Sequence, residues 1–424
     1  MNTVDPILFE LIKNNIDTIV DEMTLTMVRT AYSPGLRDVM DFSTAVCDAE
    51  GRMVAQGTCV ALHLGSIPDA IAAVRRKFAS STEPGDLFIM NDPYTGGMHL
   101  PDVFFFKPVF FDGVLLAYLV FVGHQIDIGG RVPGSMSVEA TEVFQEGLHI
   151  PPLKLYSAGR PVTAIWELIA QNVRVPDKAI GDLQGSLAAL FAAEKLLRAT
   201  VANFGLVLVR DYFGQVLEYS ERITRGRIAE IPVGHYEFSD YMDDAGTIDE
   251  PVKIKVALDV VGDELCFDFA GSSPQLPAGI NSTLSFTKSG VYAAVRCLMP
   301  RDLPTNEGFF RPIKVSAPLG SIVNPREPAA VSQRGVTGFR VVDAVFGALS
   351  QALPDHFPAA GEGGINSFHF GGYDQQSGPF SFGDSPGGTR GGGRTTTELM
   401  VVRTFLATRR MCQPSSSRRT PQSG

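Results

Sequence analysis

Two short segments combine histidine, aspartate and glycine in a pattern that could hold a metal ion. They are GMHLPD at residues 97–102 and GHQIDIGG at residues 123–130, in a chain with only seven histidines. Two neutral imidazoles and one carboxylate leave positions open on Zn²⁺, Mn²⁺ or Fe²⁺ for a water or a substrate oxygen. A structural zinc site would more often be closed by thiolates, and no cysteine lies near in sequence. The pattern therefore predicts one catalytic divalent metal ion bound by His99, Asp102 and His124.

Other interpretations of these residues stay open. All three predicted ligands could be ordinary polar residues at strand ends. Asp41 begins a predicted strand and either completes the coordination sphere or serves as a turn residue. Asp127 could be a ligand, a hydrogen-bond partner of a ligating histidine, or a strand-end cap. His63 lies in an apolar run that is typical of a core histidine.

A predicted β-hairpin gives the two segments a common geometry. Residues 103–111 and 114–122 are β-rich runs joined by Asp112-Gly113, a strong two-residue turn signal. If residues 111 and 114 pair, Pro101 lies opposite His124, and His99 is diagonal to His124 on the same face, ~7–8 Å away. Asp102 then has the opposite parity, so it requires a bend, which Pro101 could supply.

The surrounding pattern predicts a mixed α/β (α+β) fold. A long N-terminal helix and the metal-bearing hairpin sheet are followed by a central helical hairpin and a mostly β C-terminal region. Apolar periodicity and turn residues support these elements. The predicted units are a metal-site domain at 1–160, a helical hairpin at 161–232, a β-rich domain at 233–385, and a Gly/Arg-rich tail at 386–424.

Composition excludes several classes of protein. Apolar residues make up 44% and charged residues 19%, which is typical of a globular chain. The net charge of −10 argues against nucleic-acid binding. No apolar stretch is long enough to span a membrane, and no secretory signal is recognised. Five scattered cysteines without a C-x-x-C pair indicate free thiols in a reducing cytoplasm. There is also no phosphate-binding loop.

A series of motifs in order resembles the hydantoinase B/oxoprolinase B family, which also supplies a subunit of acetone and acetophenone carboxylases. The similarity covers about residues 1–385. The matching motifs include Asp5-Pro6, Asp41-Phe42-Ser43, Asn91-Asp92-Pro93-Tyr94, the two metal segments, Gln145-Glu146-Gly147-Leu148, Gly181-Asp182-Leu183, Asn281-Ser282-Thr283 and Pro328-Ala329-Ala330-Val331.

The resemblance implies a division of labour between two subunits. An A-type partner binds ATP and phosphorylates a carbonyl or amide oxygen, while the B-type subunit carries a divalent metal for the second half-reaction. It implies His99, Asp102 and His124 as ligands with Asp41 as a fourth, and it leaves Asp127 as a candidate proton acceptor. The expected reaction is hydrolysis of a cyclic amide such as a hydantoin, 5-oxoproline or a lactam.

Two alternatives accompany this expectation. The chain could be a subunit of an ATP-dependent ketone carboxylase, since such enzymes share the metal pattern. It could also be a non-catalytic subunit that only binds its A-type partner. Residues 386–424 carry seven arginines and one acid and depart from the family pattern. They are expected to be a disordered tail, or an aberrant end produced by truncation or a frameshift.

Overall fold

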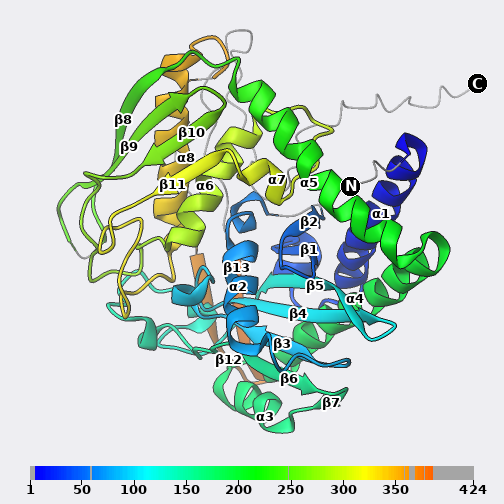
Figure 1. Cartoon of the computed structure of the whole chain (residues 1–424). Helices are drawn as coiled ribbons and strands as arrows, with labels where there is room; N and C mark the ends of the chain where they lie inside the picture. Colours follow the sequence, from blue (N-terminus) through cyan, green and yellow to red (C-terminus); the bar gives the residue numbers. More distant parts are fainter. Residues whose placement is uncertain are drawn as a thin grey trace, which may run out of the picture.

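Two β-sheets, with helices beside and between them, form most of this computed structural model, which describes residues 5–57, 60–246, 248–357, 359–361, 368–376 and 378–384. The layers run from α1 and α4, through a seven-stranded sheet, to α2, α6 and α8, and then to a four-stranded sheet (Figure 1). This arrangement confirms the predicted α+β class. The predicted tail at 386–424 lies outside the described residues.

The helices match the sequence pattern closely. The helices are α1 (Pro6–Thr30), α2 (Ser66–Phe78), α3 (Thr163–Asn172), α4 (Pro176–Phe204), α5 (Leu206–Ile228), α6 (Leu284–Arg296), α7 (Glu307–Phe310) and α8 (Arg334–Ala352). Helix α1 begins at Pro6, because the Asp5 carboxylate accepts hydrogen bonds from two first-turn amides and Pro6 occupies a position that needs no donor. Five short helical turns, η1 to η5, include η2 (Ala61–His63) and η4 (Pro133–Ser135).

Within the described part of the chain, the strands form three sheets. They are β1 (Phe42–Asp48), β2 (Met53–Gln56), β3 (Leu87–Met90), β4 (Asp102–Phe111), β5 (Val114–His124), β6 (Leu153–Ser157), β7 (Arg160–Pro161), β8 (Gly234–Met242), β9 (Val252–Val261), β10 (Glu264–Asp268), β11 (Ile313–Ser316), β12 (Phe368–Asp374) and β13 (Gly378–Asp384). The large sheet has the order β2-β1-β5-β4-β3-β6-β7 and the second has the order β11-β10-β9-β8. Strands β12 and β13 pair only with each other.

The large sheet is buried on both faces, which explains why its central strands β1, β4 and β5 are mostly apolar on both sides. One face, with Phe105 and Phe121, packs against α1 and α4. The other face, with Phe104 and Val122, joins a core that continues through α2, α6 and α8 to the four-stranded sheet. Side chains on this second face therefore point toward residues from the C-terminal half of the chain.

The β4–β5 hairpin confirms the predicted turn and corrects the predicted register. Asp112 and Gly113 both have positive φ, 48° and 78°, as a type I′ turn requires. Phe110 pairs with Leu115, but Val109 pairs with Ala117, so Leu116 of β5 is extra. Beyond this β-bulge the pairing is shifted by one residue, so the prediction that Pro101 lies opposite His124 was wrong. Asp102 lies directly opposite His124 instead, and no bend is needed.

The central helices α4 and α5 follow one another through Gly205 and contact each other. Helix α4 packs along α1 beneath the large sheet. Helix α5 turns away after Gly205 and crosses the molecule to contact α7 (Figure 1). The two helices thus join the two halves of the fold, because each packs against a different layer.

Two further expectations concern the environment of the chain. No helix among the described residues is long and apolar enough to cross a membrane. Cys47, Cys266 and Cys297 are free thiols, in keeping with the absence of a predicted disulfide framework. The cytoplasmic location stays a prediction.

The turn glycine offers a direct test of the hairpin geometry. We expect Gly113→Ala to lower the free energy of unfolding by about 1–2 kcal/mol, because an alanine is strained at positive φ although no atom lies near its Cβ. Gly214→Ala within α5 is the matched control, with equally open space and helical backbone, and it should stabilise by about 0.5–1 kcal/mol. Urea unfolding of both variants measures the difference, and equal signs would contradict the assigned turn.

Candidate metal centre

Three donor atoms from the predicted ligands converge at one end of the β4–β5 hairpin. His99 Nε2 lies 3.1 Å from Asp102 Oδ1 and 3.1 Å from His124 Nδ1. His124 Nδ1 lies 3.2 Å from Asp102 Oδ1. Ligands ~2.1 Å from a shared ion lie ~3.0–3.4 Å apart at angles between octahedral and tetrahedral. The nearly equilateral triangle therefore fits one divalent ion, and the N₂O donor set suits zinc, manganese or iron.

The strand register explains two of these positions. Asp102 and His124 are cross-strand partners, so their side chains leave the sheet on the same face. His99 lies outside the ladder, in a turn closed by a hydrogen bond from the Asp102 amide to the His99 carbonyl oxygen, 3.1 Å. This turn brings the His99 ring over the same face, with its centroid 4.9 Å from that of His124.

Burial and charge set the protonation of the ligands. The side chains of His99 and Asp102 are fully buried, whereas that of His124 is 18% exposed. Burial, aided by the nearby Arg334 guanidinium, lowers the pKa of His99 to about 3. Burial opposes ionisation of Asp102, but Arg334 and His99 hold the pKa of this carboxyl well below its usual range. Near neutral pH His99 is therefore neutral and Asp102 ionised, the forms that bind a metal.

The C-terminal half of the chain supplies the second layer of contacts. His99 Nδ1 lies 2.8 Å from the Ser332 carbonyl oxygen and 2.8 Å from Arg334 Nη1. Arg334 Nη2 donates to Asp102 Oδ2. The amides of Val331 and Ser332 both donate to Glu146 Oε1, each at 2.7 Å. Ser332 and Arg334, at the start of α8, are thus held against His99 and Asp102, which lie more than 200 residues earlier in the sequence.

Asp41 lies beside the three clustered ligands without joining their triangle. Its carbonyl oxygen accepts a hydrogen bond from the His124 amide, 3.0 Å, and Phe42 pairs with Gly123. Asp41, His124 and Asp102 therefore form one row across β1, β5 and β4. Burial opposes protonation of His124, but the hydrogen bond with Asp102 and the charge of the Asp41 carboxylate together raise its pKa. The role of Asp41 as fourth ligand stays a prediction.

Asp127 is held by four hydrogen bonds. Its carboxylate accepts from the amides of Gly129, Gly134 and Arg174 and from the Arg174 guanidinium, at 2.9–3.1 Å. It is fully buried and lies outside the donor cluster. This arrangement favours a role in shaping the loop after His124 over the predicted role of proton acceptor, because both oxygens already serve as acceptors.

Other histidines differ in their distance from the centre. His63 is buried as expected, and burial lowers its pKa, while the charges of Asp102 and Asp41 act in the opposite direction. Its Nδ1 lies 2.7 Å from the Ser43 hydroxyl. His149 instead pairs with Asp92 at 3.0 Å. Sequence reasoning missed Arg334 entirely, since a single arginine more than 200 residues away carries no local signal.

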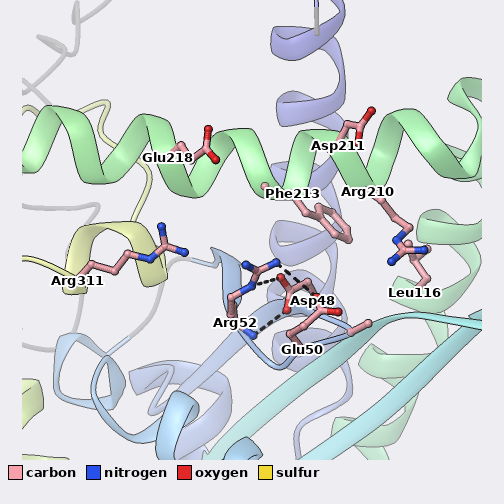
Figure 2. A pocket seen from close by; sticks show the side chains of 11 residues that line it. Asp48, Glu50, Arg52, Leu116, Arg210, Asp211, Phe213, Glu218 and Arg311 are labelled. Atoms are coloured by element: carbon pink, nitrogen blue, oxygen red, sulfur yellow. Dashed lines mark hydrogen bonds and ion pairs between the residues drawn. The ribbon is translucent and has the colours of Figure 1, made fainter. Parts of the chain in front are cut away.

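A separate cavity of about 220 Å³ lies between the β1–β2 turn and α5 (Figure 2). Several of its charged lining residues form ion pairs, as in the Arg52–Asp48 contact at 2.6 Å. Asp48 ends β1, whereas Asp41 precedes it, so a seven-residue strand of ~20 Å separates the cavity from the ligand row. None of the three clustered ligands lines it, so this cavity is not part of the metal centre.

Comparison with known proteins identifies relatives along nearly the whole chain. The sequence model of the family described as hydantoinase B/oxoprolinase matches residues 5–414. An uncharacterized protein of Methanocaldococcus jannaschii is 34% identical over 378 residues, 87% of this chain and 66% of that protein. The caprolactamase subunit beta of Pseudomonas jessenii is 33% identical over 362 residues, 85% of this chain and 62% of that subunit.

Solved structures agree with this assignment. The ATP-dependent caprolactamase of Pseudomonas jessenii superimposes with a TM-score of 0.83 at 31% identity, covering 90% of this chain and 66% of that one. A nucleotide-free acetone carboxylase also gives a TM-score of 0.83, but at 20% identity, covering 89% of this chain and 53% of that one, so it shows the shared fold alone. The chain spans about two thirds of the length of the first relatives.

Glu146 generates a prediction about pH. Burial raises its pKa to about 8, against 4.5 for an ordinary glutamate. The folded protein therefore holds this proton more tightly than the unfolded chain, and stability falls as pH rises from about 4.5 to 8. Glu146→Gln keeps the acceptor oxygen for Val331 and Ser332 but cannot ionise. It should therefore remove this pH-dependent decrease in the free energy of unfolding, which is on the order of a few kcal/mol.

Chemical denaturation at several pH values between 5 and 8.5 measures this effect. Glu139→Gln provides the control, because Glu139 is an exposed acid of the same loop region paired with Arg131. A slope that is the same in the wild type and in Glu146→Gln would contradict the assignment of a buried, protonated Glu146.

Proposed function

Because the chain belongs to the hydantoinase B/oxoprolinase family, we propose that it is the metal-bearing subunit of an ATP-dependent enzyme that opens a cyclic amide. The substrate class comprises hydantoins, 5-oxoproline and lactams. An A-type subunit is the proposed partner and the site of ATP binding. The resident metal is one divalent ion, held by His99, Asp102 and His124 with Asp41 beside them.

The observation that carries this proposal is the triangle of donor atoms. Two imidazole nitrogens and a carboxylate oxygen at 3.1–3.2 Å from one another are suited to three adjacent positions on one ion. A divalent ion held there would act as a Lewis acid and make a water ligand acidic near neutral pH. Three protein ligands leave room for such chemistry, whereas a closed structural site does not.

The protein's own residues orient the site. His99 and Asp102 are fully buried and fix the inner side of the triangle, while His124 is 18% exposed. Substrate therefore approaches from the side of His124. The row of Asp41, His124 and Asp102 holds these groups on rigid strand ends, so the geometry needs little rearrangement when substrate arrives.

The division of labour follows from the chemistry of amides. A ring amide is a weak electrophile, and phosphorylation of its oxygen by ATP makes that oxygen a good leaving group. This chain has no phosphate-binding loop of a known type. The related caprolactamase is described as ATP-dependent, and a matching part of it is called subunit beta. These points support an ATP-binding partner subunit.

Metal content tests the proposed centre. We expect purified wild-type protein to hold about one divalent ion per chain, and His99→Ala and His124→Ala to hold almost none, because two ligands cannot retain it against a chelator. His235→Ala is the control, since His235 is an exposed residue of β8 paired with Asp259. Elemental analysis after dialysis gives the numbers, and equal trace metal in all four proteins would refute the centre.

ATP consumption tests the proposed partner. The isolated chain should not hydrolyse ATP, and co-expression with the A-type subunit should give ATP cleavage that depends on a cyclic amide. Hydantoin, 5-oxoproline and caprolactam are the substrates to compare, with acetone and acetophenone to detect the ketone carboxylase alternative. Turnover of ATP by this chain alone would contradict the division of labour, and carboxylation without amide hydrolysis would overturn the proposed reaction.

A further inference from the structure

A single nitrogen of His99 has two competing partners from the C-terminal half of the chain. Nδ1 lies 2.8 Å from the Ser332 carbonyl oxygen, which can only accept a hydrogen bond, and 2.8 Å from Arg334 Nη1, which can only donate. Nδ1 either carries a hydrogen or presents a lone pair. The two contacts therefore cannot both be hydrogen bonds at the same time.

Each contact selects one tautomer of the ring. With hydrogen on Nδ1, His99 donates to Ser332 and its Nε2 presents a lone pair toward the other ligands. With hydrogen on Nε2, the ring donates to Asp102 Oδ1 at 3.1 Å, and Nδ1 accepts from Arg334. Only the first tautomer can bind a metal through Nε2. Arg334 thus stabilises the tautomer that cannot bind one.

The guanidinium of Arg334 is also a buried positive charge beside the ligands. Arg334 is 8% exposed, donates to Asp102 Oδ2, and lies with Cζ 4.5 Å from the centre of the Phe286 ring. Its Nε has no hydrogen-bond partner. The guanidinium therefore neutralises a fully buried carboxylate that would otherwise be costly to bury.

We propose that Arg334 acts as a competing cation that limits the affinity of the metal centre. Arg334 compensates the charge of Asp102 and holds His99 in the tautomer that cannot bind a metal through Nε2. Binding a divalent ion therefore requires the loss of the hydrogen bond between Arg334 and His99. It also places two cations close together. This inference rests on the proposed metal function. Arg334 is then a positioning residue that lowers metal affinity through its charge. A partner that merely orients a ligand raises metal affinity instead.

The test compares Zn²⁺ affinity and stability in chelator-treated protein. Arg334→Met should raise Zn²⁺ affinity by at least roughly tenfold in competition with a chelator, because the repulsion and the tautomer preference are removed. It should also lower the melting temperature without zinc, since Asp102 loses its counter-charge, and so enlarge the thermal shift on adding zinc. Arg334→Lys keeps the charge and should give a smaller gain in affinity.

Arg340→Met serves as the matched control, because Arg340 lies two turns along α8 and pairs with Asp240 at 3.2 Å. It should leave Zn²⁺ affinity unchanged. The visible spectrum of the Co²⁺-loaded protein should be the same in the wild type and in Arg334→Met, because the ligands do not change. A new spectrum would attribute any gain in affinity to a different ligand set and overturn the inference.

Several results separate the inference from the proposed function. If Zn²⁺ affinity falls or stays the same in Arg334→Met while the wild type binds zinc, the competing role is refuted and the metal centre stands. If the wild type takes up no zinc, both fall. If Arg334→Met does not fold without metal, the Lys variant decides, since an affinity equal to or below that of the wild type contradicts the tautomer argument.

Discussion

One inserted residue in β5 determines which side chains face the candidate metal centre. Side chains alternate between the faces of a strand, so a shift of one residue moves every following side chain to the other face. The β-bulge close to the turn of the hairpin changes the pairing from that point on, and Asp102 becomes the direct partner of His124. The same sheet aligns Asp41 with His124 through β1. The row across three strands is therefore a consequence of register, and the turn at His99 needs to add only one more donor.

The second constraint is the burial of charge. Asp102 is fully buried among apolar strands, and an isolated carboxylate there would be strongly destabilising. The compensating charge comes from Arg334, the first residue of α8, which packs between the two sheets. The N-terminal half thus supplies the donor atoms, and the C-terminal half supplies the charge and the hydrogen bonds that orient them. Neither half contains a complete site, because the ligands and their supports are more than 200 residues apart.

Much of this architecture was accessible from the sequence. Apolar periodicity predicted the long N-terminal helix, and Asp112-Gly113 predicted the hairpin turn, because these signals are local. The proximity of His99, Asp102 and His124 was also predicted, since scarce histidines flank one hairpin. The register was wrong, because a bulge inside an unbroken apolar run has no sequence mark. Arg334 and Ser332 were missed, because their approach to His99 depends on how distant layers pack.

Substitutions in the two halves of the fold affect different properties of the site. A substitution of a ligand removes a donor atom and with it the geometry of the triangle. A change at the start of α8 keeps all three donor atoms and alters the charge and the hydrogen bonds that act on them. Since the electrophilic strength of a bound cation depends on the charge and hydrogen bonding around its ligands, this segment can adjust the chemistry of the centre independently of the ligand set. The tie between Glu146 and the amides of Val331 and Ser332 holds the segment in place for that role.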